Sequence, residues 1–326
     1  MTTLGELGED AVVDLIAGRL ISPPSLGENL GHPDDARDML PRGPRIIYSM
    51  DAYRVRSLML PWRTWRDIGW MALTGAVSDI VSKGGLPSVA MVGLGLSRDA
   101  SIEEVEELAT GLREAGEHYG VRITGGDTNE GGDPWIAVSV IGFTTCKRPP
   151  SRRGAKPGDT VVVTGLYGGM GFVALHGVEK AGELEWVVKA SRRTSVRVEV
   201  AHVIMSTYRF IHASMDVSDG LGYTLQHISA LSGHGIALKK PPLHPPELDE
   251  YCRGETSCIW RHVLAGGEEY GVVLVVDGGG LSTVVKELEY YGVPYTVVGE
   301  VVESPPGIYI DGVKASPPRW DQFKGW

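Results

Sequence analysis

The chain has 326 residues, of which 42% are hydrophobic and 22% are charged. This composition is ordinary for a globular protein and excludes a disordered, fibrous or low-complexity chain. Lys and Arg total 31 and Asp and Glu total 41, so the net charge is −10, and a phosphate backbone would repel such a surface. We therefore expect no general nucleic-acid binding, and about two domains at roughly 150 residues each.

Strands and helices are predicted to alternate along both halves of the chain. In the first half, apolar runs predict strands over 46–49, 89–96, 121–124 and 135–145, with a helix over 67–83. Ser101 and Glu104 form the pattern of a capping box, so a second helix is expected from Ser101. In this half, Asp51 and the run 125–128 are expected in turns that follow strands.

In the second half, the pattern predicts strands over 160–164, 271–276 and 295–301, and helices over 196–205, 281–291 and from Leu221. The segment 147–158 is polar and rich in proline and glycine, which is typical of a domain boundary. We expect an N-terminal domain over 1–147 and a C-terminal domain over 148–326. The alternation of strands and helices predicts an α/β or α+β fold in each.

The three cysteines, Cys146, Cys252 and Cys258, are sparse and lack CxxC spacing, so neither a zinc site nor a disulfide framework is expected. Cys252 and Cys258 could pair locally, but two ordinary thiols are the favoured interpretation. Residues 1–10 are acidic and lack the apolar core of a signal peptide. The most apolar stretch, 161–178, contains five glycines and predicts a strand, a glycine turn and a helix rather than a membrane span. We expect a cytoplasmic protein without a membrane partner.

A set of aspartates lies in predicted turns or at predicted helix ends: Asp34, Asp35, Asp51, Asp79, Asp127, Asp216 and Asp219. Each alone is typical of a turn or a helix N-cap. Two carboxylates about 4 Å apart repel by roughly 4 kcal/mol at an effective dielectric constant near 20, so a cluster would need cations. Oxygen ligands favour Mg²⁺, which favours phosphate substrates. The set therefore predicts binding of Mg-nucleotide and phosphoryl transfer.

Two further motifs are candidates for the same chemistry. In the run 216–221, Ser218 lies between two aspartates, and a helix that begins near Leu221 would present N–H groups to a phosphate. An ordinary N-cap at Ser218 or Asp219 stays open as an alternative. Glu268, between glycines in the run 265–271, is a candidate acceptor for an amine or a pyrimidine, and a solvated turn is its alternative. The glycine cluster 165–171 lacks Gly-Lys-Ser/Thr and predicts a strand-to-helix turn.

The motifs together carry a family resemblance. They occur in one order along nearly the whole chain, at 31–36, 48–51, 77–79, 125–128, 154–159, 216–221 and 266–270. With them the chain resembles the thiamine-monophosphate kinases, in the superfamily that includes aminoimidazole ribonucleotide synthetase. The resemblance implies two α/β domains, a homodimer formed by mixed-sheet N-terminal domains, and direct transfer of a phosphoryl group from ATP to thiamine monophosphate.

The resemblance also implies roles for single residues. It implies that several Mg²⁺ ions are held by Asp35, Ser49, the backbone oxygen of Met50, Asp51, Asp79, Asp127, Asp216 and Asp219. The metals on Asp216, Asp79 and Asp51 would stabilise the transition state, without a strong base, because the attacking phosphate oxygen is already ionised. It implies ATP contacts at Gly126, Asp127, Arg152 and Ser218, and substrate contacts at Glu268, Trp326 and the position of Leu58.

The sequence departs from the family pattern at two of these places. Met50-Asp51-Ala52 stands where the family has Thr-Asp-Thr, so a hydroxyl is lost on each side of Asp51. A histidine that touches substrate in the family falls near Leu58, so that contact is expected to be absent. Two alternatives stay open: another ATP-using member of the superfamily, of the aminoimidazole ribonucleotide synthetase type, and a non-catalytic protein that binds Mg-nucleotide.

Overall fold

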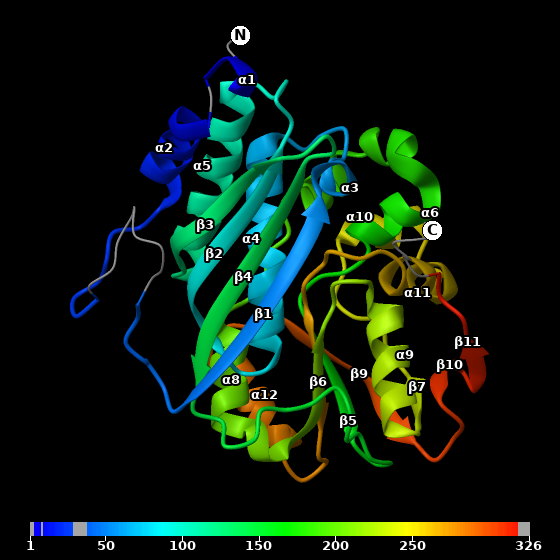
Figure 1. Ribbon diagram of the computed structural model, residues 1–326. Helices are drawn as coiled ribbons and strands as arrows, with labels where there is room; N and C mark the ends of the chain where they lie inside the picture. The colour runs from blue at the N-terminus through cyan, green and yellow to red at the C-terminus, as the bar shows by residue number, and fades with distance from the viewer. Residues whose placement is uncertain (1–2, 8, 29–37, 319–326) are drawn as a thin grey trace. The chain divides into compact units, whose positions relative to one another are not determined.

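The computed structural model describes residues 3–7, 9–28 and 38–318 (Figure 1). The chain divides into two compact units, each with its own sheet. The N-terminal unit comprises Met1–Ile80 and Leu86–Thr145, and the C-terminal unit comprises Val81–Gly85 and Cys146–Trp326. The mixture of sheets and helices in both units confirms the predicted α/β class.

The N-terminal unit contains a four-stranded mixed sheet of order β1-β4-β2-β3. Its strands are β1 (Arg45–Arg54), β2 (Leu86–Leu96), β3 (Arg122–Glu130) and β4 (Trp135–Thr144). Its helices are α1 (Leu4–Leu7), α2 (Glu9–Leu20), α3 (Val55–Leu58), α4 (Trp65–Ser82) and α5 (Ile102–Tyr119). The part of α4 after Ile80 is assigned to the C-terminal unit. Strand β2 runs parallel to β3 and antiparallel to β4, and β1 is antiparallel to β4.

Helices α4 and α5 pack against each other and cover one face of this sheet (Figure 1). Ile68 and Met71 of α4 and Leu108 and Leu112 of α5 are fully buried in that layer. The predicted capping box is confirmed, since Ser101 Oγ accepts from the Glu104 amide at 3.2 Å and Glu104 Oε2 accepts from the Ser101 amide at 2.9 Å. The cap satisfies two amide groups that the first turn of α5 would otherwise leave without partners.

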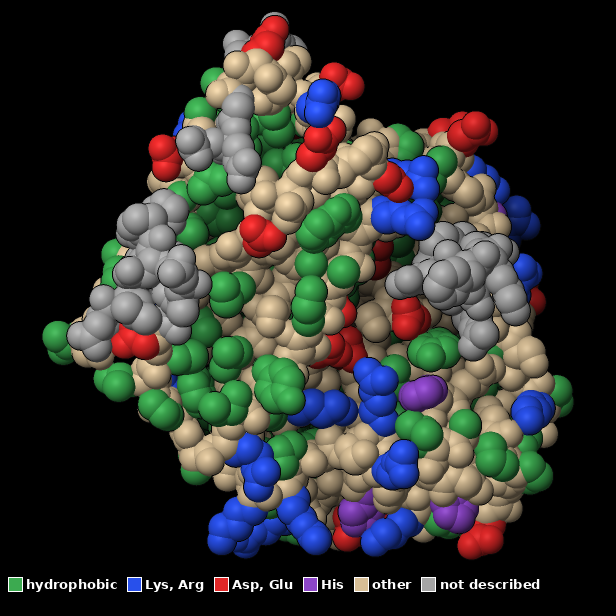
Figure 2. Space-filling model, in the orientation of Figure 1, with side chains coloured by type: hydrophobic (Ala, Val, Ile, Leu, Met, Phe, Trp, Pro, Cys, Tyr) green, Lys and Arg blue, Asp and Glu red, His purple; other side chains and the backbone are tan. Residues whose placement is uncertain are grey.

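Strand β1 shows the alternation of a half-covered strand. The side chains of Ser49 and Asp51 are half-buried on one face, whereas those of Ile46, Tyr48 and Met50 are 55%, 79% and 64% exposed on the other. Figure 2 shows apolar side chains gathered over the front strands of this unit. Exposed apolar residues in such a row are unusual and indicate an interaction surface.

The C-terminal unit contains a seven-stranded sheet of order β11-β10-β7-β9-β5-β8-β6. Its strands are β5 (Thr160–Thr164), β6 (Ile211–Asp216), β7 (Gly235–Leu238), β8 (Val272–Val276), β9 (Tyr295–Val302), β10 (Gly307–Ile310) and β11 (Val313–Ala315). Its helices are α6 (Gly169–Gly182), α7 (Glu185–Arg192), α8 (Glu199–Thr207), α9 (Leu221–Ser232), α10 (Pro246–Tyr251), α11 (Thr256–Leu264) and α12 (Leu281–Tyr290), and η1 (Tyr208–Phe210) is a short 3-10 helix. Every residue of β8 is buried, and the strand pairs with β5 on one side and with the edge strand β6 on the other.

Most predicted elements are confirmed, but two expectations about turns are wrong. Asp51 does not follow a strand, because β1 continues to Arg54 through its pairing with β4. The run 125–128 does not form a turn but lies within β3, where it pairs in parallel with β2 after a shift in register at Ala90 and Met91. In both cases a neighbouring strand supplies hydrogen-bond partners to residues whose own propensities favour a turn.

The interpretation of Cys252 and Cys258 as two thiols is also wrong, because a disulfide joins them. Arg253 and Gly254, with φ of 53° and 73°, reverse the chain between α10 and α11 and bring the two Cα atoms to 5.6 Å. Cys146 is buried and takes no part in a disulfide. Among the described residues, no helix combines the length and apolar character that a bilayer crossing needs.

Candidate functional site

The N-terminal unit brings three of the predicted oxygen ligands together at the interface of β1 and α4. Ser49 and Asp51 lie two residues apart, so they share the face of β1 that is turned towards α4. Ser49 Oγ donates to Asp79 Oδ2 at 2.5 Å, and Tyr53 Oη donates to Asp51 Oδ2 at 3.1 Å. The two hydroxyls orient the carboxylates, whose oxygens can each accept more than one hydrogen bond.

Gly75 of α4 is a determinant of this arrangement that the sequence analysis missed. A Cβ atom at this position would lie 2.1 Å from Tyr53 Oη and 3.0 Å from Asp51 Oδ2. Gly75 and Asp79 are four residues apart and therefore lie on one face of the helix. The signal in the sequence was a glycine inside a helical pattern. Such a glycine lowers helix stability, so its presence indicates a packing or functional reason.

Three other predicted residues of this unit have different surroundings. Asp127 is exposed on β3 and accepts from Asn129 Nδ2 at 2.7 Å. A Cβ atom at Gly126 would lie 1.8 Å from the Val92 carbonyl oxygen, so the glycine is required for the approach of β2 and β3. The Met50 side chain points to the opposite face of the sheet from Ser49 and Asp51, so only the Met50 backbone could contribute a ligand beside them.

The Leu58 side chain is 1% exposed in α3, and its carbonyl oxygen accepts from Arg63 Nη1 at 2.8 Å. A side chain so completely buried offers no surface to a ligand. The contribution of position 58 to substrate binding stays a prediction.

In the C-terminal unit, backbone pairing brings the run 216–221 beside the run 266–270. The amides of Glu268 and Tyr270 donate to the carbonyl oxygens of Ser218 and Val217 at 2.6 Å and 3.0 Å, and the Val217 amide donates to the Gly271 carbonyl at 2.8 Å. Asp216, at the end of β6, is 2% exposed. These bonds explain how two motifs about 50 residues apart in sequence reach one place.

Glycines permit this pairing. A Cβ atom at Gly220 would lie 2.3 Å from the Gly266 carbonyl oxygen, and one at Gly267 would lie 2.4 Å from the Ser218 carbonyl oxygen. Directly after Gly267, the non-glycine residues Glu268 and Tyr270 have φ of 59° and 47°. Backbone conformations of this kind are costly and concentrate at functional sites.

Glu269 is a second residue that the sequence analysis missed, although its neighbour was selected. It is 7% exposed, and its Oε1 accepts from the amides of Gly168 and Met170 at 2.7 Å and 3.2 Å at the start of α6. Burial raises the pKa of this carboxyl well above its ordinary value, although the amide bonds act in the opposite direction. The glycine cluster 165–171 is thus the predicted strand-to-helix turn, with a buried acid at the N-terminus of its helix.

A cavity of about 510 Å³ in the C-terminal unit adjoins Glu269. Its lining includes the aromatic side chains of Tyr167 and Trp186 and the basic side chains of Lys189 and Arg193. The Tyr167 hydroxyl is fully buried, and burial followed by the charges of Glu269 and Asp216 raises its pKa well above the ordinary value. The cavity therefore combines aromatic walls with cationic groups, as sites for small organic molecules often do.

The remaining predicted residues differ in their surroundings. Arg152 is exposed, and its charge contributes, after burial, to lowering the pKa of His227 in α9. Ser218 is half-buried and Asp219 is exposed, just before α9. Asp35 and Trp326 lie outside the described residues.

The chemistry of the donors identifies the kind of cation that they suit. The grouped side chains offer oxygen atoms: Ser49, Asp51 and Asp79 in the N-terminal unit, and Asp216, Ser218 and Asp219 in the C-terminal unit. Hard oxygen donors of this kind fit Mg²⁺ rather than zinc or copper, which prefer nitrogen and sulfur. A side chain at position 75 would collide with Asp51, so the glycine there lets Asp51 approach α4 closely.

Comparison with known proteins gives the family. Residues 33–144 match the model of the AIR synthase related protein, N-terminal domain, and residues 156–311 match the corresponding C-terminal domain. A thiamine-monophosphate kinase of Aquifex aeolicus is 30% identical over 98% of this chain and 99% of its own length.

Two solved structures extend the likeness to the fold. A thiamine-monophosphate kinase from Stenotrophomonas maltophilia has a TM-score of 0.79 at 25% identity, over 95% of this chain and 98% of the other. A structure described as AaThiL complexed with AMPPCP and TMP has a TM-score of 0.72 at 27% identity, over 99% of both chains. The chain therefore belongs to the thiamine-monophosphate kinase family of AIR synthase related proteins.

Proposed function

We propose that this protein is a kinase that transfers a phosphoryl group from ATP to thiamine monophosphate and yields ADP and thiamine diphosphate. The observation that carries the proposal is 30% identity to a thiamine-monophosphate kinase over essentially the whole of both chains. The oxygen donors described above support it, because phosphoryl transfer requires groups that hold cations against phosphates.

The proposed reaction requires Mg²⁺, which neutralises phosphate charge and aligns the reacting oxygens when it is bound. We assign its binding to Ser49, the Met50 carbonyl, Asp51, Asp79, Asp127, Asp216 and Asp219, with Asp35 as a further prediction outside the described residues. Asp51, Asp79 and Asp216 are the proposed catalytic ligands. All of the aspartates that the family pattern uses as metal ligands are present in this chain. A protein that binds nucleotide without catalysis would not need the full set.

The chain's own hydroxyls have a positioning role in this proposal. Ser49 donates to Asp79 and Tyr53 donates to Asp51, so both carboxylates are oriented before any cation binds. Preorganised ligands avoid a reorganisation cost at the moment of reaction. No residue is assigned as a general base, because the attacking oxygen of a phosphate monoester is already ionised near neutral pH.

The substrates are assigned to separate groups of residues. Gly126, Asp127, Arg152 and Ser218 are the proposed contacts of ATP, and Glu268 is the proposed partner of the thiamine pyrimidine. Stacking of Trp326 on the substrate stays a prediction. Truncation at Trp326 is expected to raise the KM for thiamine monophosphate much more than the KM for ATP, and equal changes in both would contradict the stacking.

We also propose that two copies pair through the exposed face of β1. Ile46, Tyr48 and Met50 form an apolar row there, and a second copy would cover it. Light scattering should give the mass of a homodimer for the wild type and that of a monomer for Tyr48→Asp. A monomeric wild type would contradict the proposal. The proposed compartment is the cytoplasm, where ATP is abundant.

The deciding experiment incubates the purified protein with Mg²⁺, ATP and thiamine monophosphate and separates the products by chromatography. Equal amounts of thiamine diphosphate and ADP would establish the kinase. If the protein bound ATP but formed no thiamine diphosphate, its substrate would be that of another member of the superfamily. Formylglycinamidine ribonucleotide would then be tested next. No binding of ATP would contradict the assignment of the carboxylates.

A further inference from the structure

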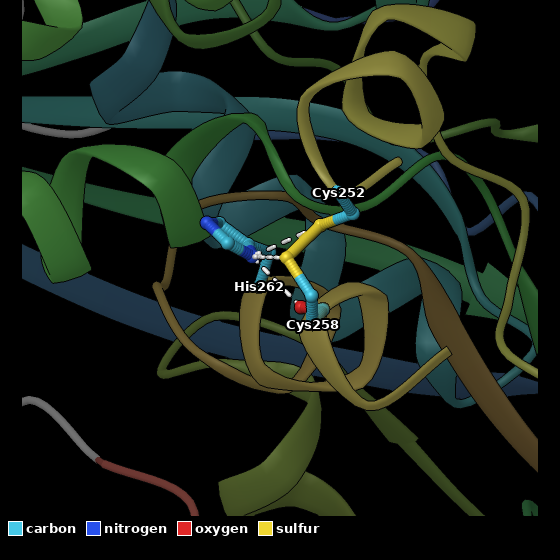
Figure 3. A group of neighbouring side chains, drawn as sticks. All are labelled: Cys252, Cys258 and His262. Atoms are coloured by element: carbon cyan, nitrogen blue, oxygen red, sulfur yellow. Dashed lines mark hydrogen bonds between the residues drawn. A yellow bond between two sulfur atoms is a disulfide. The ribbon is translucent and has the colours of Figure 1, made fainter. Parts of the chain in front are cut away.

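A cluster of sulfur and nitrogen atoms lies apart from the oxygen donors, at the turn between α10 and α11 of the C-terminal unit. Sγ of Cys252, Sγ of Cys258 and a ring nitrogen of His262 lie within 4.8 Å of one another (Figure 3). Cys252 and His262 are 4% exposed, and Cys258 is half-buried. Two sulfurs and an imidazole are the donors that zinc and other thiophilic cations prefer.

Local structure explains why the three donors meet. Cys258 and His262 are four residues apart on α11, so their side chains lie on one face, one turn apart. The reversed chain at Arg253 and Gly254 returns Cys252 to the same face. His262 Nδ1 is 3.9 Å from each sulfur. The Cys-x3-His spacing was visible in the sequence, but without the turn it did not indicate a third donor.

The other ring nitrogen of His262 also has a hydrogen-bond partner. His262 Nε2 is 3.0 Å from His176 Nε2 of α6. Metal-binding histidines almost always use their second ring nitrogen in a hydrogen bond that sets their orientation and tautomer.

The disulfide form holds His262 in the tautomer that cannot bind a cation through Nδ1. Nδ1 is 2.8 Å from the Cys258 carbonyl oxygen, which can only accept, so Nδ1 carries the proton and Nε2 accepts from His176. The Cys258 carbonyl lies four residues before His262 in an α-helix and accepts its backbone amide as well. Loss of the ring hydrogen bond would therefore leave this carbonyl with a partner.

We propose that Cys252, Cys258 and His262 form a binding site for a thiophilic divalent cation such as Zn²⁺ when the disulfide is reduced. A dithiol reductant supplies two electrons and two protons, the S–S bond breaks, and the reductant becomes a disulfide. Binding of the cation then releases the two thiol protons. Both histidines exchange tautomer through solvent, so that His262 Nδ1 becomes a ligand and the His262–His176 hydrogen bond reverses its direction.

The two states exclude each other, because a sulfur in a disulfide has no thiolate charge to offer a metal. In a reducing compartment, paired cysteines of an enzyme are more often metal ligands or catalytic thiols than structural bridges. The three protein donors leave a fourth position of a tetrahedral site for water. The site is therefore a redox-dependent metal site, distinct from the oxygen ligands proposed for magnesium.

The test uses the full-length protein and Co²⁺ as a spectroscopic probe. After reduction with a dithiol and removal of the reductant without oxygen, one equivalent of Co²⁺ should produce sulfur-to-metal charge-transfer absorption and tetrahedral d–d bands. Zn²⁺ should displace it. The same protein in its disulfide form should show neither band, and this comparison needs no variant.

Variants assign the ligands. Cys258→Ser and His262→Asn should each bind Co²⁺ at least 100-fold more weakly than the reduced wild type. Cys146→Ser is the matched control, because it removes a buried thiol that lies outside the cluster, and it should keep the full spectrum. Circular dichroism confirms the fold of each variant. The proposal is overturned if the reduced wild type gives no thiolate charge-transfer band, or if the spectrum is lost in Cys146→Ser and kept in Cys258→Ser.

Discussion

Two acids of the N-terminal unit and two of the C-terminal unit, all at or beside the candidate site residues, differ in their access to water. In the N-terminal unit Asp127 is exposed and Asp79 is half-buried, and they accept from Asn129 and Ser49. In the C-terminal unit Asp216 is 2% exposed and Glu269 is 7% exposed. Carboxylates that reach water keep their charge at little cost, whereas a buried one must be hydrogen-bonded, paired with a cation or protonated. Asp216 should therefore be more sensitive to substitution than the N-terminal acids, and Glu269 should be more sensitive to pH.

The largest effect is expected for Asp216→Asn. It removes the charge of the most buried candidate ligand while keeping its shape, so turnover should fall by about 10²–10³-fold, as for loss of one preorganised electrostatic group. The release of ADP measures turnover, and circular dichroism measures the fold. Wild-type turnover in a folded Asp216→Asn protein would remove Asp216 from the proposed metal ligands.

Asp79→Asn tests the more solvated acids of the N-terminal unit. We expect turnover to fall by about 10²-fold and the Mg²⁺ concentration for half-maximal activity to rise. Ser49→Ala keeps the carboxylate and removes one neutral hydroxyl, which orients Asp79 and is itself a proposed Mg²⁺ ligand, so its effect should be about tenfold, or near 1.4 kcal/mol. Equal losses in the two variants would contradict the ranking of the charged ligand Asp79 above the neutral ligand Ser49.

Gly75→Ala tests the packing that holds the N-terminal ligands. The added Cβ would overlap Tyr53 Oη, so we expect the free energy of unfolding to fall by about 1–3 kcal/mol, as in overpacked interiors. Gly18→Ala is the control, because nothing lies within 4 Å of a Cβ atom there, and it should be neutral or stabilising. Denaturant titration measures both. An unchanged midpoint in Gly75→Ala would show that α4 and β1 can separate without cost.

The smallest effect is expected for Glu269→Gln, and it depends on pH. Because the folded protein raises the pKa of Glu269 above its unfolded value, the folded state binds this proton more tightly. The resulting stability is fully present below about pH 4.5 and is lost as the pH rises through the folded pKa. Glutamine keeps the acceptor for the Gly168 and Met170 amides and cannot ionise. The stability of the wild type relative to the variant should therefore decrease between pH 5 and pH 9 in urea titrations, and parallel curves would refute the assignment.

Much of the fold follows from local patterns. The capping box at Ser101 and the helix from Leu221 were predicted because their causes lie within a few residues. The extension of β1 through Asp51 and of β3 through Gly125–Thr128 was not, because pairing with β4 and β2 overrides turn propensity there. The site shows the same division, since the motif residues were found in sequence and Gly75 and Glu269 were recognised only through their contacts.

By itself the sequence determined the α/β class, the order of the motifs and the identity of the candidate ligands, since these depend on residue type, periodicity and spacing. The tertiary structure alone decided which of them meet: Ser49 with Asp79, Ser218 with Glu268, and Cys252 with Cys258 and His262. The physical reason is that these contacts join segments through backbone pairing, close approach at glycines and burial. Backbone pairing, close approach at glycines and burial each depend on both contacting segments, so none can be predicted from the sequence of one segment alone.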